Sequence, residues 1–245
     1  MQSASNTKAV NVRNVIMKRE LNAYFTSPVA YIVCVLFLLF SGFTFFSTFF
    51  IAGRAELRAF FNMLPIMFSF FIPALTMRLF SEEQRVGSME TLLTLPVTVT
   101  DIVLGKYRAA LISSVVLLVP SLSYVIVCYM FGTPDVGPII GSYAGAILLA
   151  AAFTAIGIFA SSCTKNQIVA FFIAFALCIF LTLISSFAVI MPAQIAAIIS
   201  FISADSHFDS ISRGIIDTRD VLYFISLIAI FLVLTINTIN NSRKG

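Results

Sequence analysis

The sequence predicts an all-α membrane protein with six transmembrane helices. Sixty per cent of its residues are hydrophobic and only 11% are charged, and it contains 26 Phe but no Trp. An ordinary soluble domain is about half apolar and about a quarter charged, so it could not bury this much apolar surface. Six long apolar stretches and their short connections occupy nearly the whole chain. We therefore expect one membrane domain over residues 1–245.

The segment 12–25 precedes the first apolar stretch and predicts a helix lying in the membrane interface. Four residues recur along one side at helical spacing: Met17, Leu21, Tyr24 and Phe25. Val12 and Ile16 fall off this stripe, and basic residues flank it, a composition typical of interfacial helices. A frayed basic tail is the alternative. No apolar run precedes residue 29, so a signal peptide is not expected.

Six segments are long enough to cross a bilayer, which takes about 20 mostly apolar residues. They are residues 29–52, 59–80, 103–131, 138–161, 167–190 and 220–238. Ser27 and Pro28 are suited to open the first as N-cap and first helical residue. Prolines within the second and third spans predict a local bend or break: Pro65, Pro73 and Pro120.

The distribution of basic residues predicts the orientation. With the N-terminus inside, 11 of the 15 Lys and Arg residues fall on the inner side. Cytoplasmic loops carry this excess in membrane proteins. We expect a multi-pass protein of the bacterial cytoplasmic (inner) membrane with both termini in the cytoplasm.

An outer segment, residues 191–219, separates the last two spans. Its first part is apolar but too short to cross, which predicts a re-entrant or surface helix. It also holds the only histidine, His207. Without ligands at metal-site spacing, this side chain is interpreted as a hydrogen-bonded surface residue.

Small residues and cysteines inside the apolar stretches are interpreted mainly as packing elements. The four cysteines, none in a C-x-x-C pair, predict neither a disulfide nor a metal site: Cys34, Cys128, Cys163 and Cys178. Gly141 and Gly145 form a G-x-x-x-G motif that permits close helix approach. It fits either a dimer contact or packing within one subunit.

The polar connection 81–106 stands out between two apolar spans. Arg78 and Glu82 are spaced to extend the second span as a charged helix, and Gly87 permits a sharp turn. A short amphipathic helix is predicted from Met89 to Leu93, ending at Pro96. Thr98 and Asp101 have the S/T-x-x-D/E spacing that predicts a cap for the next helix. A helix of two turns is not stable alone in water, so it must lie on headgroups or in a protein groove. A loop folded back on the membrane is the alternative.

This connection carries the pattern E-E-x-x-x-G-S-M-E-x-L-L-x-x-P, followed by I-V-L-G-K. The pattern resembles the signature of ABC-2 type transporter permeases. Its matching positions are Glu82, Glu83, Gly87, Glu90, Leu92, Leu93, Pro96, Gly105 and Lys106. The resemblance implies that 81–106 is a coupling element resting in a groove of a cytoplasmic ATP-binding subunit. The expected coupling residues are Glu82, Glu83, Arg85, Gly87, Met89, Glu90, Leu92, Leu93 and Pro96.

The outer stretch HFDSISRGIIDTRDVLYF is similar to permeases grouped with gliding-motility and nitrous-oxide-reductase-accessory ABC systems. The resemblance implies two ATP-binding subunits, which hold ATP and Mg²⁺, and a second permease, identical or related. A protein with an external domain is a further possible partner, and no nucleic acid is expected.

The only Gly-Lys pair, Gly105-Lys106, does not belong to a P-loop, because Thr100 stands where the first Gly of that motif would be. The spans are nearly free of charge, which disfavours an enzyme site or an ion-coupled transporter. The expected function is export of an unidentified, amphiphilic cargo. The alternative is a membrane anchor that passes ATP-driven motion to an external partner without moving a solute.

Overall fold

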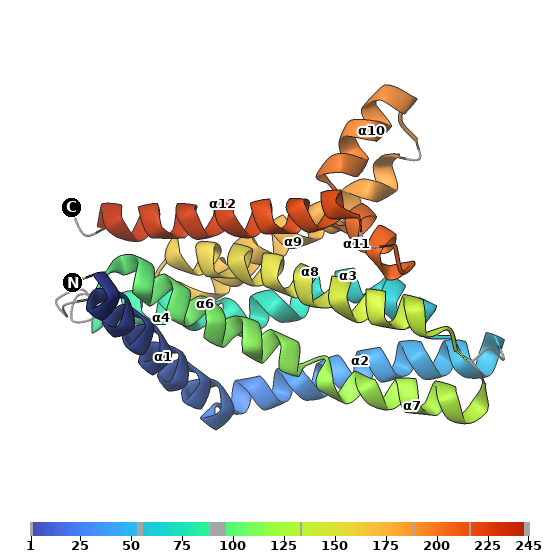
Figure 1. The fold of residues 1–245 in the computed structure, drawn as a ribbon, viewed down its shortest axis with the longest axis horizontal. Coiled ribbons are helices and arrows are strands. Elements are labelled where there is room, and N and C mark those ends of the chain that lie inside the picture. Colours follow the sequence, from blue (N-terminus) through green and yellow to red (C-terminus); the bar gives the residue numbers. More distant parts are fainter. Residues whose placement is uncertain are drawn as a thin grey trace.

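The computed structural model describes residues 2–52, 56–88, 97–132, 134–188, 190–215 and 217–242, and these form helices, turns and short connections without a strand. The long helices run side by side along one axis (Figure 1). The first helix begins and the last helix ends at the same end of this bundle. We call it the proximal end, and the opposite one the distal end.

Six helical segments are long and apolar enough to cross a membrane. They are α2 (Pro28–Ala52), α3 with α4 (Arg58–Thr76 and Arg78–Val86), α6 through the 3-10 turn η1 to α7 (Val99–Val116, Val119–Ser121 and Leu122–Phe131), α8 (Val136–Ser162), α9 (Gln167–Ala188) and α12 (Thr218–Ser242). These helices confirm the six predicted spans. The second extends further than expected, because α4 continues α3 beyond residue 80.

Helix α8 forms the centre of the bundle. In its most apolar window 78% of the residues are buried, against 17% in α12. Small residues allow neighbouring helices to approach closely: a Cβ added at Gly157 would lie 2.0 Å from Thr76 Oγ1 of α3. Helices α2, α9 and α12 lie at the periphery and leave apolar side chains uncovered, as lipid-facing helices do.

The prolines act differently in the two spans that contain them. Helix α3 continues through Pro65 and Pro73, so the expected break is displaced to Met77, where α3 gives way to α4. Ser161 of α8 stabilises this junction: its hydroxyl donates to Met77 O at 2.8 Å and accepts from the amides of Phe80 and Ser81. At Pro120 the chain adopts the 3-10 turn η1, which confirms the predicted break.

The outer segment folds as two helices with different surroundings. Helix α10 (Ala193–Ile202) projects sideways from the bundle (Figure 1), whereas α11 (Ala204–Ser212) packs on α8. A Cβ at Gly141 would lie 2.6 Å from Ile211 O, and Gly145 faces Phe208 and Ile211. The G-x-x-x-G motif therefore serves packing within this subunit.

Helix α1 (Gln2–Thr26) lies obliquely across the proximal end (Figure 1). Among its side chains from residue 13 onward, Glu20 and Tyr24 are buried and Ile16 packs against the core. Phe25, which the predicted apolar stripe included, is 46% exposed. The predicted stripe is therefore correct at Tyr24 and wrong at Phe25, and it left out Ile16, which lies at the contact with α6.

Candidate functional site

A buried cluster of charges joins α1, α4 and α6 at the proximal end. At its centre is Lys106 of α6, whose side chain is only 1% exposed. Its ammonium donates to Glu20 Oε1 at 3.0 Å, to Glu83 Oε1 at 2.9 Å and to Leu79 O at 2.8 Å. An ammonium has three N–H donors, so every donor of Lys106 is used.

Arg19 completes the cluster from the solvent side. Its guanidinium lies 3.1 Å from Glu83 Oε1 and 3.5 Å from Glu20 Oε1. Two cations thus face two carboxylates, so the cluster carries no net charge. Burying ions is costly unless they are paired and hydrogen-bonded. We infer that Lys106 remains buried only while both acids stay in place.

A second ion pair fixes α1 to the first turn of α6. Arg13 Nε lies 2.5 Å from Asp101 Oδ1. Thr98 caps α6 by accepting from the Asp101 amide and donates its hydroxyl to Asp101 Oδ2 at 2.6 Å, which confirms the predicted cap. A Cβ added at Gly105 would lie 2.9 Å from Ile16 Cγ2, so the glycine permits the close crossing of the two helices.

Helix α1 is also tied to the end of α3. Tyr24 donates its hydroxyl to Leu75 O at 2.8 Å, and Arg78 donates to Ser27 Oγ at 2.6 Å. The Arg78 guanidinium lies 5.4 Å from the centre of the Tyr24 ring, within the range of a cation–π contact. Burial raises the pKa of Tyr24 well above its usual value, so the hydroxyl stays a donor at any ordinary pH.

The predicted coupling residues on α4 occupy different environments. Glu83 belongs to the buried cluster, whereas Glu82 and Arg85 are exposed. The predicted pairing of Arg78 with Glu82 does not occur, since the Arg78 side chain turns to Ser27. Helix α4 ends at Gly87, whose φ of +77° confirms the predicted turn, because this conformation suits glycine.

The remaining predicted coupling residues lie outside the described residues: Met89, Glu90, Leu92, Leu93 and Pro96. The described chain leaves α4 after Gly87 and returns before Thr98, the cap of α6. The segment between them therefore begins and ends on two helices that Lys106 joins directly.

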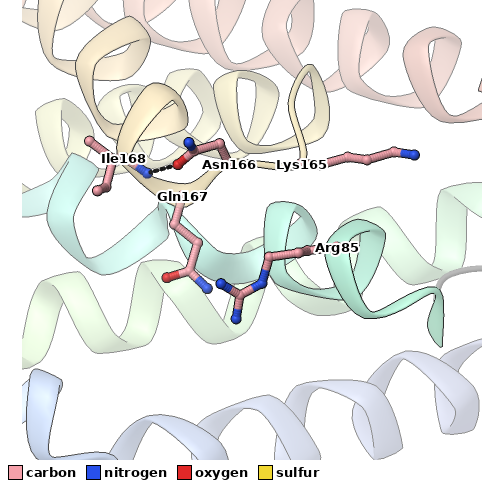
Figure 2. Close-up of a pocket in the computed structure, with 5 residues that line it drawn as sticks. All are labelled: Arg85, Lys165, Asn166, Gln167 and Ile168. Atoms are coloured by element: carbon pink, nitrogen blue, oxygen red, sulfur yellow. Dashed lines mark hydrogen bonds between the residues drawn. The ribbon is translucent and has the colours of Figure 1, made fainter.

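Arg85 lines a separate cavity of about 340 Å³ between α4 and the connection from α8 to α9. In Figure 2 its guanidinium and the Gln167 side chain point toward each other, while Lys165 points away. Asn166 caps α9 by accepting from the Ile168 amide at 2.9 Å. This cavity is open, and the two charged side chains that line it, Arg85 and Lys165, are exposed rather than buried.

Four residues that fasten α1 to its neighbours were not predicted as site residues from the sequence: Arg13, Glu20, Tyr24 and Asp101. One signal was available. Lys106 lies inside the predicted third span, and a lysine that is buried there requires an acceptor. The sequence does not say which acid supplies it.

The family model described as ABC-2 family transporter protein matches residues 28–244. The chain belongs to this family. No curated protein matches it. ABC-2 permeases are membrane domains that work with an ATP-binding subunit, and the six apolar helices make this chain a multi-pass membrane protein. Helix α1, which supplies Glu20 and Arg13, precedes the matched residues of this ABC-2 permease.

Proposed function

We propose that this chain is the permease subunit of an ATP-driven ABC-2 exporter in the bacterial cytoplasmic membrane, with both termini in the cytoplasm. A separate subunit, present in two copies, would bind ATP and Mg²⁺. The observation that carries this proposal is the Lys106 cluster. It joins α4 and α6, the helices on either side of residues 88–97, to one another and to α1.

The cluster supports a mechanical role for the connection. A push on residues 88–97 by the ATP-binding subunit would act on α4 and α6 together, because Lys106 bonds both Leu79 and Glu83 across the gap between these helices. Ser161 anchors the start of α4 to the central helix α8. Displacement of the connection would therefore reach α3, α6 and α8.

The cargo path is proposed to lie between this chain and a second permease, identical or related. Helix α3 is mostly buried, yet three of its apolar side chains are exposed on one side: Met63, Ile66 and Phe70. Phe70 also contacts Phe171 and Phe175 of α9. This apolar, aromatic wall suits an amphiphilic cargo. We also propose that this chain belongs to the permeases grouped with gliding-motility and nitrous-oxide-reductase-accessory ABC systems.

The proposal is tested by purifying the protein with its ATP-binding subunit. Leu92→Asp should reduce assembly and ATP turnover by placing a charge on the docking side of the segment. Glu83→Gln should leave assembly intact but lower cargo-stimulated turnover, since it weakens the Lys106 link. Glu56→Gln, an exposed distal acid, is the control. Unchanged assembly and turnover in the first two variants would contradict the proposal.

A second candidate function is transmission of ATP-driven motion to an external partner. The projection of α10 from the bundle favours it (Figure 1), because this helix exposes Ile195, Ile198 and Phe201. Reconstitution in vesicles separates the two functions. Cargo accumulation across the membrane supports export, whereas ATP hydrolysis that requires an external protein and moves no solute supports transmission.

A further inference from the structure

A cavity of about 290 Å³ opens beside the charge cluster, between α1 and α4. Arg78, Tyr24, Glu82 and Glu83 line it. Its volume lies just below the range of about 300–1,000 Å³ typical of small-molecule sites. The cavity therefore suits a small polar group rather than a whole amphiphile.

The charges around this cavity are not all paired. Arg19 and Lys106 are balanced by Glu20 and Glu83. Arg78 is half-buried, and among the described residues it has a hydroxyl and an aromatic ring as partners but no carboxylate. A guanidinium carries five N–H donors, so most of those of Arg78 remain available to a ligand.

Carboxylate oxygens that line the cavity also lack hydrogen-bond donors. The Oε2 atom of Glu83 is buried and receives no hydrogen bond from the described residues. Glu82 lines the same cavity and makes no ion pair within the described part of the chain. A buried carboxylate oxygen without a donor is costly. A ligand that brings an N–H donor to it would remove this cost.

The cavity lies close to the start of the first span. Arg78, the first residue of α4, bonds Ser27, which directly precedes α2, and Lys106 lies in the first half of α6. Polar side chains at such positions meet lipid headgroups. The ligand chemistry required is therefore a phosphate for Arg78 together with a primary ammonium for Glu83 and Glu82.

We propose that this cavity binds the phosphoethanolamine headgroup of a phospholipid in the proximal leaflet. The phosphate accepts hydrogen bonds from Arg78, and the ammonium donates to Glu83 Oε2 and Glu82. A choline headgroup has no N–H to donate, and a glycerol headgroup has no positive charge. The site therefore distinguishes phosphatidylethanolamine from both phosphatidylcholine and phosphatidylglycerol.

The test is native mass spectrometry of the delipidated full chain, titrated with dioleoyl phosphatidylethanolamine, phosphatidylcholine or phosphatidylglycerol. Phosphatidylethanolamine should bind roughly tenfold more tightly than the other two, as expected when one hydrogen bond to a charged group is gained. Arg78→Gln should weaken the binding of all three lipids, because each carries the phosphate that Arg78 contacts. Arg58→Gln, which changes an exposed arginine at the distal end of the same helical run, should leave their binding unchanged.

Glu82→Gln provides a second variant, because its exposed side chain is not needed for folding and it should weaken the preference even if Arg78→Gln does not fold. Equal binding of the three lipids, or a preference for phosphatidylglycerol, would overturn the proposal. An equal affinity for water-soluble phosphoethanolamine would overturn its assignment to a lipid.

Discussion

The two ends of the bundle each hold a non-spanning helix through buried ionisable groups, but by different means. At the proximal end, Lys106 ties α1 to α4 and α6 with three hydrogen bonds. At the distal end, His207 of α11 bonds Asp220 of α12 through Nδ1 at 2.6 Å and Phe201 O of α10 through Nε2 at 3.1 Å. His207 is hydrogen-bonded as predicted, yet it is buried, not at the surface.

The proximal contact is a network of ion pairs, whereas the distal contact is held by packing and hydrogen bonds. At the proximal end, moving the helices apart would separate the Lys106 ammonium from both carboxylates. The distal histidine stacks on Tyr223 with ring centres 4.1 Å apart, and the Tyr223 hydroxyl bonds Ile202 O at 2.6 Å. The proximal end is therefore the more strongly coupled of the two.

Removing the central cation should have the largest effect. Lys106→Met leaves Glu20 and Glu83 buried without their main partner, which should lower the free energy of unfolding by about 3–5 kcal/mol. Reversible unfolding in mixed micelles measures this loss. Lys165→Met, an exposed lysine at the same end, is the control. Adding Glu20→Gln to Lys106→Met should restore part of the stability, and a purely additive double variant would contradict the network.

The matching change at the distal end should cost less. His207→Phe preserves stacking on Tyr223 but leaves the buried Asp220 without its hydrogen bond. The expected loss is about 2–3 kcal/mol, measured in the same micelles. His207→Asn, which keeps an N–H near the position of Nδ1, should recover part of it. A loss as large as that of Lys106→Met would remove the distinction between the two ends.

Glycine contacts at the two ends offer a third comparison. An added Cβ at distal Gly141 meets the backbone oxygen of Ile211 at 2.6 Å, whereas at proximal Gly105 it meets the Ile16 side chain at 2.9 Å. Side chains can move aside more easily than backbone. Overpacking usually lowers the free energy of unfolding by about 1–3 kcal/mol. Gly141→Ala should therefore cost an amount near the upper end of this range, and Gly105→Ala an amount near its lower end. The reverse order in unfolding measurements would contradict these contacts.

The smallest effect concerns pH at the distal end. Burial raises the pKa of Asp205, the Asp209 carboxylate raises it further, and the Ser185 hydroxyl opposes the shift. A folded-state pKa above the unfolded one means that stability is fully present below the unfolded value of about 3.9 and is lost as pH rises through the folded value. Asp205→Asn should thus stabilise the protein slightly at pH 7, with the gain shrinking toward pH 4. Melting curves across this range test it, and a pH-independent gain would contradict it.

Much of the fold was predictable because each signal was local. Apolar runs long enough to span a bilayer identified the six spans, and Thr98 with Asp101, Gly87 and Pro120 marked a cap, a turn and a break that the structure confirms. The packed side of α1 was predictable only in part, at Tyr24. Its contact with α6 is made by Arg13, Ile16 and Glu20, and polar residues on a buried helix face carry no periodic apolar signal.

The candidate site was likewise predictable only in part. The sequence by itself determined the class of protein, the number of spans and the position of the polar connection 81–106, because hydropathy and motif spacing can be read along the chain. Only the tertiary structure decided that Lys106 is buried between Glu20 and Glu83, which are 86 and 23 residues away, and that Gly141 and Gly145 receive α11. Pairing between distant residues depends on how helices cross, and that is settled by packing of the whole bundle.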